Sequence, residues 1–132
     1  MADRGQEQRK HIFAINGSVD FLNIVRELFQ EEDYNVTTTN FVPNSFEQIQ
    51  ALQPDALLVD VAAGESAGWE LLEQLHAAAA TNHIPVLVLS TSPRLLERAR
   101  ELAERYGNHR YLNKPFDLEV LLSNIREMIG EA

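Results

Sequence analysis

Three side chains with different chemistry each lie at the end of a short run that is typical of a strand. Asp60 ends the run ALLVD, Ser90 ends the run VLVLS, and Lys114 follows the run RYLN. An aspartate carboxylate can attack a phosphoryl donor as a nucleophile. A lysine ammonium can neutralise charge on phosphoryl oxygens, and a serine hydroxyl can donate a hydrogen bond to one of them. If the three runs are parallel strands of one sheet, their ends meet at one edge and predict phosphoryl chemistry on Asp60.

Each of these residues also has an ordinary structural role. An aspartate or serine after a strand often ends a turn or caps a helix, and a lysine before a proline is usually exposed. Lysine usage favours the chemical interpretation, because the chain has nine arginines and only two lysines, Lys10 and Lys114. Lys114 thus places a compact positive charge at a strand end, where it could neutralise the charge of a phosphoryl group. The coincidence of the three residues, more than any one of them, indicates a site.

Short β-rich runs alternate with amphipathic segments along the chain. This alternation predicts an α/β fold with a parallel sheet and helices on both of its faces. The apolar runs before Asp60 and Ser90 are typical of strands buried on both faces. Ser18 and Asp117 are the expected N-caps of the first and last helices. The expected strands are 11–15, 34–39, 55–60, 84–90 and 109–113, and the expected helices are 19–32, 43–52, 69–80, 93–107 and 117–129.

The composition limits the class of protein. The 132 residues suffice for one domain, and 45% of them are hydrophobic, as in a globular core. The formal net charge of -9 argues against direct nucleic-acid binding, and the absence of cysteine excludes disulfides and thiolate zinc sites. No signal peptide and no run of roughly 20 apolar residues is present. We therefore expect a cytoplasmic protein without membrane association, with a flexible tail at 1–10 and one folded domain at 11–132.

The segments PDALLVDVAAGESAGWELL, IPVLVLS and GNHRYLNKPFD resemble the diagnostic segments of the receiver domains of two-component response regulators. The resemblance extends from residue 11 to about residue 130. It implies a flavodoxin-like (βα)5 three-layer sandwich, in which a five-stranded parallel sheet has the order 2-1-3-4-5. It also implies a signalling domain and not an enzyme.

The resemblance assigns roles to individual residues. Asp60 matches the phospho-acceptor, and Ser90 and Lys114 match the residues that contact the phosphoryl group. Tyr111 matches the aromatic residue of the family's conformational switch. The family usually has a cis bond before the proline of its KPF motif, so a cis peptide is implied between Lys114 and Pro115.

The sequence departs from the family where the first strand ends. The family has two adjacent acids there that help to hold Mg²⁺, and INGSVDFL has Asn16 and Gly17 in their place. The metal ligands that remain are Asp60 and the backbone carbonyl of Ala62. Mg²⁺ demands oxygen ligands in a near-octahedral arrangement and gives up water reluctantly, so we predict that Mg²⁺ binding is weak. Loss of the two acids also predicts that Asp60 forms a direct ion pair with Lys114.

Two other acids are candidate replacements for the missing pair. Asp20 falls in the first turn of the first helix, where an acid suits the helix dipole. Glu65 lies in the loop after Asp60 and could swing toward the site, although a loop glutamate is ordinarily solvated. Neither is expected to restore a strong metal site.

Two functional hypotheses follow from these residues. In the first, a histidine kinase or a histidine phosphotransfer protein donates a phosphoryl group to Asp60, and Ser90 and Tyr111 then move. Their movement would reshape the face made by 93–107, 109–113 and 117–129. In the second, the domain is a degenerate receiver that binds other proteins without being phosphorylated. The retained Asp60 and Lys114 favour the first hypothesis, and the lost acids favour the second.

The resemblance also allows a homodimer through the same face, because that region commonly mediates dimers in the family. An enzyme of another class on a flavodoxin-like sheet is less well supported. A flavin site would need a phosphate-binding loop rich in Ser, Thr and Gly after the first strand. The sequence NGS is short for such a loop, and no G-x-G-x-x-G motif is present.

Overall fold

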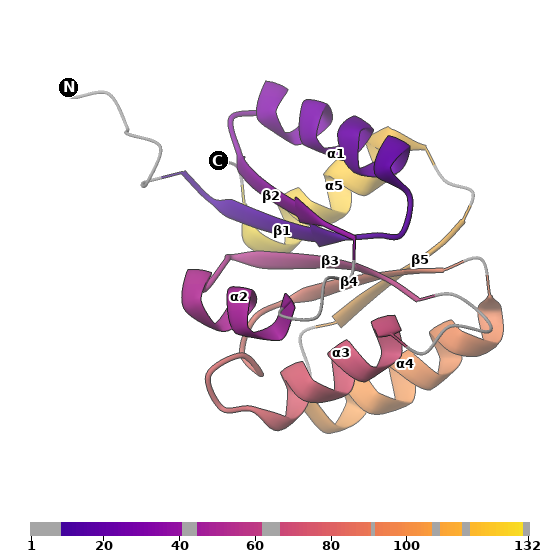
Figure 1. The fold of residues 1–132 in the computed structure, drawn as a ribbon. Coiled ribbons are helices and arrows are strands. Elements are labelled where there is room, and N and C mark those ends of the chain that lie inside the picture. Colours follow the sequence, from indigo (N-terminus) through magenta and orange to yellow (C-terminus); the bar gives the residue numbers. More distant parts are fainter. Residues whose placement is uncertain are drawn as a thin grey trace.

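Strands and helices alternate strictly along the computed structural model of this chain (Figure 1). The structure describes residues 9–40, 45–61, 67–90, 92–106, 109–114 and 117–130. Within these ranges the elements are β1 (His11–Ile15), α1 (Val19–Glu31), β2 (Asn35–Thr39), α2 (Ser45–Leu52), β3 (Ala56–Asp60), α3 (Ala67–Ala77), β4 (Val86–Ser90), α4 (Pro93–Tyr106), β5 (His109–Asn113) and α5 (Leu118–Ile129).

The strands form one parallel sheet in the order β2-β1-β3-β4-β5, which confirms the predicted topology. Ile15 of β1 lies opposite Val59 of β3, and Val59 lies opposite Val88 of β4. Helices α1 and α5 cover one face of the sheet, and α2, α3 and α4 cover the other (Figure 1). The molecule is therefore the expected three-layer sandwich, and the carboxyl ends of all five strands point to the same edge.

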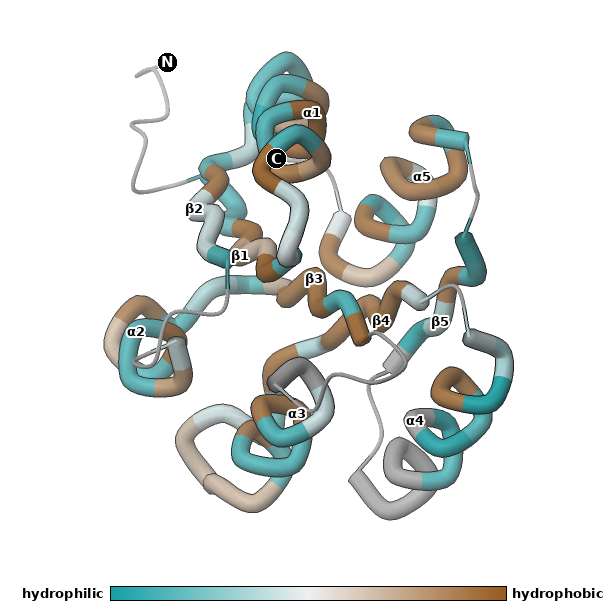
Figure 2. Tube along the Cα trace, turned by 45° about the vertical axis from the view of Figure 1, so that its right-hand side comes forward, coloured by the Kyte–Doolittle hydropathy of each residue, from teal (hydrophilic) through white to brown (hydrophobic). Residues whose placement is uncertain are grey.

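The sheet separates two apolar cores because successive side chains of a strand point to opposite faces. Phe13, Leu57 and Val88 pack on the side of α2, α3 and α4. Ile12 and Leu58 pack on the side of α1 and α5. Figure 2 shows the hydrophobic stripes of the helices turned toward the strands. The runs in β3 and β4 are continuously apolar because both of their faces are buried.

Several element boundaries differ from the predicted ones by one to three residues, and two of the differences have a local cause. The third helix spans 67–77 and not 69–80. The Thr81 hydroxyl donates to the Leu75 carbonyl at 2.7 Å, and the Thr81 amide donates to the Ala78 carbonyl at 3.1 Å, which satisfies carbonyls at the helix end. The fourth strand begins at Val86 and not at residue 84. Pro85 precedes it and lacks the N–H that a ladder needs.

The expected helix caps are partly confirmed. The Ser18 hydroxyl accepts a hydrogen bond from the Phe21 amide at 3.2 Å, as an N-cap does. Asp117 occupies the N-cap position of α5 with extended backbone, but its side chain makes no capping bond. The expected helix limits at Pro43 and Gly107 lie outside the described residues.

Two histidines have a lowered pKa in the folded protein. Burial is the main cause at His11 and outweighs the nearby Asp55 carboxylate, which raises the pKa. Burial is also the main cause at His76 and outweighs a hydrogen bond from its ring to the Leu72 backbone, which raises the pKa. The unfolded chain therefore binds more protons than the folded one once the pH falls to the ordinary histidine pKa of 6.5. Their contribution to stability is complete above that pH and declines below it.

We expect the urea midpoint of unfolding to be lower at about pH 5.5 than at about pH 7.5. The double variant His11→Gln/His76→Gln should show a smaller difference between the two pH values, because the two shifted groups are gone. Urea titrations monitored by circular dichroism measure both differences. An equal pH dependence in the native chain and the double variant would contradict this assignment.

Candidate functional site

The carboxyl edge of the sheet contains an ion pair between the ends of two strands. The Lys114 ammonium lies 2.5 Å from Oδ1 of Asp60. The two side chains are only 24% and 13% exposed, respectively, so the pair is largely shielded from solvent. This contact confirms the resting ion pair predicted from the loss of the strand-one acids.

The strand register explains why these two side chains meet. The ladder continues past the strand ends, where the Val61 amide donates to the Leu89 carbonyl and the Lys114 amide donates to the Ser90 carbonyl, each at 2.9 Å. Leu58 and Leu112, two residues before Asp60 and Lys114 respectively, face the core of α1 and α5. Alternation therefore directs both charged side chains to the α1–α5 side of the sheet.

The first turn of α1 closes this side of the site. The Lys114 ammonium lies 5.3 Å from the centre of the Phe21 ring, within the range of a cation–π contact. The aromatic ring and the carboxylate together hold the ammonium at the edge of the sheet. The sequence alone did not reveal Phe21 as a neighbour of the site, because its spacing also fits the apolar stripe of the helix.

Ser90 and Tyr111 lie on the other side of the sheet. Ser90 is fully buried, and its hydroxyl accepts a hydrogen bond from the Ser92 amide at 3.0 Å, immediately before α4. Tyr111 packs against the core of α2, α3 and α4, and the Arg100 guanidinium lies 5.1 Å from the centre of its ring. Both residues therefore contact α4 or the turn that begins it, while the ion pair faces α1 and α5.

Asn16 and Gly17 occupy the end of β1. The Asn16 backbone amide continues the ladder by donating to the Thr39 carbonyl at 3.1 Å. Asn16 is 4% exposed, and its Oδ1 accepts a hydrogen bond from the Ser18 amide at 2.8 Å. A Cβ atom added at Gly17 would meet nothing within 4 Å. Gly17 therefore leaves open space beside the strand end.

The described residues do not supply the ligand set of a strong magnesium site. They contain no group of three or more His, Cys, Asp or Glu side chains that could hold a metal ion. One oxygen of Asp60 is bound to Lys114, and the amide oxygen of Asn16 is bound to Ser18. Ala62 and Glu65 lie outside the described residues, as do Pro115 and the peptide bond implied to be cis.

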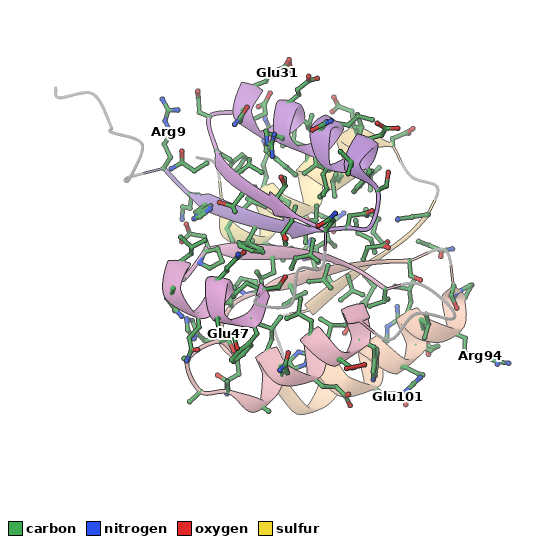
Figure 3. The ribbon with its side chains drawn as sticks, viewed as in Figure 1. Arg9, Glu31, Glu47, Arg94 and Glu101 are labelled. Atoms are coloured by element: carbon green, nitrogen blue, oxygen red, sulfur yellow. The ribbon has the colours of Figure 1, made fainter. Side chains whose placement is uncertain are left out.

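Arginines of α4 contact aromatic rings of neighbouring elements. The Arg98 guanidinium lies 4.5 Å from the centre of the Trp69 ring of α3, and Arg100 lies over Tyr111 of β5. Arg94 and Glu101 point outward from the same helix (Figure 3). The frequent pairing of arginine with aromatic faces is the one general signal that could have suggested these contacts.

A surface hollow lies elsewhere, at the amino-terminal ends of β1 and β2. Asp60, Ser90 and Lys114 do not line it, so the hollow is separate from the candidate site. The residues that line the hollow are Arg9, His11, Gln30, Tyr34, Asn35, Val36 and Thr37.

In the described part of the chain, no helix is long and apolar enough to cross a membrane.

Comparisons with known proteins agree with this geometry. The family model of the response regulator receiver domain matches residues 12–126. Response regulator MprA of Mycobacterium leprae is 30% identical over 118 residues, which are 89% of this chain and 50% of that protein. Protein PilH of Pseudomonas aeruginosa is 32% identical over 78 residues, which are 59% of this chain and 63% of that protein.

Solved structures share the fold. Chemotaxis response regulator CheY4 of Vibrio cholerae aligns with a TM-score of 0.76 and 21% identity, over 91% of this chain and 98% of that one. The receiver domain of sensor histidine kinase PA1611 from Pseudomonas aeruginosa aligns with a TM-score of 0.74 and 20% identity, over 93% and 99% of the two chains. That structure has a magnesium ion coordinated in its active site cleft.

The chain belongs to the response regulator receiver domain family, because the family model covers most of its length. It is homologous to two-component response regulators. The chain spans about half the length, or less, of the curated MprA proteins that it matches.

The double variant Asn16→Asp/Gly17→Asp should bind Mg²⁺ at least about tenfold more tightly than the native chain, because it supplies two carboxylate ligands beside Asp60. The open space at Gly17 accommodates the new side chain. Isothermal titration calorimetry with MgCl₂ measures the difference. Asn40→Asp/Asn113→Asp adds the same charge at two exposed positions and serves as the control. Equal affinities in the two double variants would show that the ligand positions are wrong.

Proposed function

We propose that this domain receives a phosphoryl group on Asp60 from a histidine kinase or a histidine phosphotransfer protein. The observation that carries the proposal is the contact between the Lys114 ammonium and the Asp60 carboxylate at the carboxyl edge of the sheet. In open parallel sheets this edge is where ligands bind. We further propose that the domain acts in the cytoplasm as a signalling module and not as an enzyme, without binding nucleic acid or membranes directly.

The proposed chemistry is nucleophilic substitution at phosphorus. An oxygen of the Asp60 carboxylate forms a bond to the phosphorus atom of the donor. The bond between phosphorus and the donor's leaving atom breaks, and the leaving group takes the electron pair. The product is an acyl phosphate on Asp60. The Lys114 ammonium is close enough to move from the carboxylate oxygen to a phosphoryl oxygen and offset its charge.

Ser90 and Tyr111 offer a route from Asp60 to the opposite face of the sheet. The Ser90 hydroxyl is bound to the Ser92 amide at the start of α4. We propose that the hydroxyl turns to donate to a phosphoryl oxygen and so loses the bond from the Ser92 amide, which would release the start of α4. Tyr111 would follow, because Arg100 of the same helix lies over its ring. The face of α4, β5 and α5 is accordingly the proposed surface for partners and for a homodimer.

Mg²⁺ is proposed to contribute weakly in this domain. The PA1611 receiver holds a magnesium ion, but the described residues here lack the acids of a strong site. A module that binds partners without phosphorylation remains the alternative, and the lost acids at Asn16 and Gly17 are the observation in its favour. The comparisons do not favour this alternative over phosphorylation.

Incubation with acetyl phosphate should add one phosphoryl group to the native chain and none to Asp60→Asn, because the carboxylate is the nucleophile. Intact mass spectrometry measures the adduct, with and without Mg²⁺. Asp20→Asn removes an exposed acid near the site and is the matched control, which should label like the native chain. Absence of an adduct in the native chain under both conditions would refute the proposal and favour the alternative.

A further inference from the structure

The amide of Asn16 has an unused hydrogen-bond donor beside the proposed phosphorylation site. Its Nδ2 is buried and has no hydrogen-bond partner among the described residues. We propose that this amide donates a hydrogen bond to the phosphoryl group on Asp60 and so makes phosphorylation independent of a metal ion. The inference rests on the proposed function and names a further binding residue of the same site.

The orientation of the amide is determined by its neighbour. The oxygen and nitrogen of an asparagine side chain are distinguished by their hydrogen-bond partners. Here the Ser18 amide donates to the side chain at 2.8 Å, so the atom that faces Ser18 must be the oxygen. Exchanging the two atoms would bring two donors together. The NH₂ group therefore points away from the α1 turn and keeps its two hydrogens available.

The position of Asn16 places this donor next to Asp60. Ile15 and Val59 are opposite each other in the sheet, so the residues that follow them lie on adjacent strands at the same level. Ala14 and Leu58 face the same core, and alternation directs Asn16 and Asp60 to that same side. Neighbouring strands are roughly 4.8 Å apart. Both donors, Asn16 and Lys114, therefore flank the Asp60 carboxylate.

The burial of this donor argues against a purely structural role. A buried N–H group without an acceptor destabilises the fold, and native proteins contain few of them. The Ser18 contact uses only the oxygen of Asn16. A threonine or serine hydroxyl at position 16 could accept the same hydrogen bond from the Ser18 amide. An acceptor that is present only after phosphorylation would satisfy the nitrogen. A phosphoryl oxygen on Asp60 is such an acceptor.

The chemistry of an amide suits this task. A carboxylate at position 16 would repel a phosphoryl dianion unless a cation were bound between them. The neutral amide does not repel the phosphoryl group, and it donates directly to an oxygen on which charge develops. With acetyl phosphate as donor, an Asp60 oxygen bonds to phosphorus while the bond from phosphorus to the acetate oxygen breaks. Acetate leaves with the electron pair, and Asn16 and Lys114 contact the transferred oxygens.

The test compares labelling rates with acetyl phosphate in the presence of EDTA and in the presence of Mg²⁺. The native chain should label in EDTA, and Asn16→Ala should label there at least about tenfold more slowly. Asn16→Asp should label slowly in EDTA and regain rate in Mg²⁺, because a carboxylate needs the cation. Asn113→Ala, the same change at an exposed strand end, should match the native chain. A merely structural role would slow Asn16→Asp equally in both conditions.

The outcomes separate this inference from the proposed function. No labelling of the native chain in either condition overturns both. Labelling in Mg²⁺ but not in EDTA overturns the inference alone, and so does an Asn16→Ala rate in EDTA equal to the native rate. A second measurement needs no variant. In the ¹⁵N-labelled native chain, the side-chain NH₂ resonances of Asn16 should shift downfield on phosphorylation. Unchanged Asn16 resonances in a fully phosphorylated sample contradict the proposed hydrogen bond.

Discussion

The ion pair between Asp60 and Lys114 constrains the rest of the site. A carboxylate that is only 13% exposed at the end of a buried strand needs a counter-charge close by. The parallel sheet provides one, because β3 and β5 end at the same edge, and Asp60 and Lys114 alternate to the same face, Lys114 being the residue after β5. The ammonium is held in turn by the ring of Phe21 from α1. Removing any of these elements would leave a charge without its partner.

The charge balance around the Asp60–Lys114 ion pair distinguishes this domain from a receiver that has two acids at the end of its first strand. Asn16 and Gly17 contribute no negative charge, so one carboxylate faces one ammonium. Such a pocket has little to attract a divalent cation, and it has less electrostatic resistance to an incoming phosphoryl group. The replacement of the two acids by Asn16 and Gly17 therefore removes metal ligands and also favours phosphoryl transfer to Asp60 without a metal ion. The buried amide of Asn16 supplies a donor where the cation would have supplied charge.

Much of the fold and part of the site could be predicted from the sequence. The continuous apolar runs of β3 and β4 indicated doubly covered strands, and the order of strands followed from the family resemblance. The contact of Asp60 with Lys114 could be predicted because opposite charges at the ends of β3 and β5, which only β4 separates, attract once competing acids are absent. The end of α3 could not, because it depends on the Thr81 hydroxyl reaching a carbonyl six residues earlier.

The orientations of several side chains also could not be predicted from the sequence. That Ser90 binds the turn before α4, and that the Asn16 nitrogen lacks a partner, depend on the exact path of two loops. The contacts of Arg98 with Trp69 and of Arg100 with Tyr111 depend on how α4 is rotated. Charged residues on a helix surface look alike in a sequence, whether they face solvent or an aromatic ring.

The central claim is that the Lys114 ammonium, and not a metal ion, is the main counter-charge of Asp60. Its most direct test is the rate of phosphorylation by acetyl phosphate in EDTA for Lys114→Met. Lys10→Met, which removes the other lysine of the chain, is the matched control. The account predicts a rate at least about 100-fold lower for Lys114→Met and an unchanged rate for Lys10→Met. Equal rates for the two variants would contradict it.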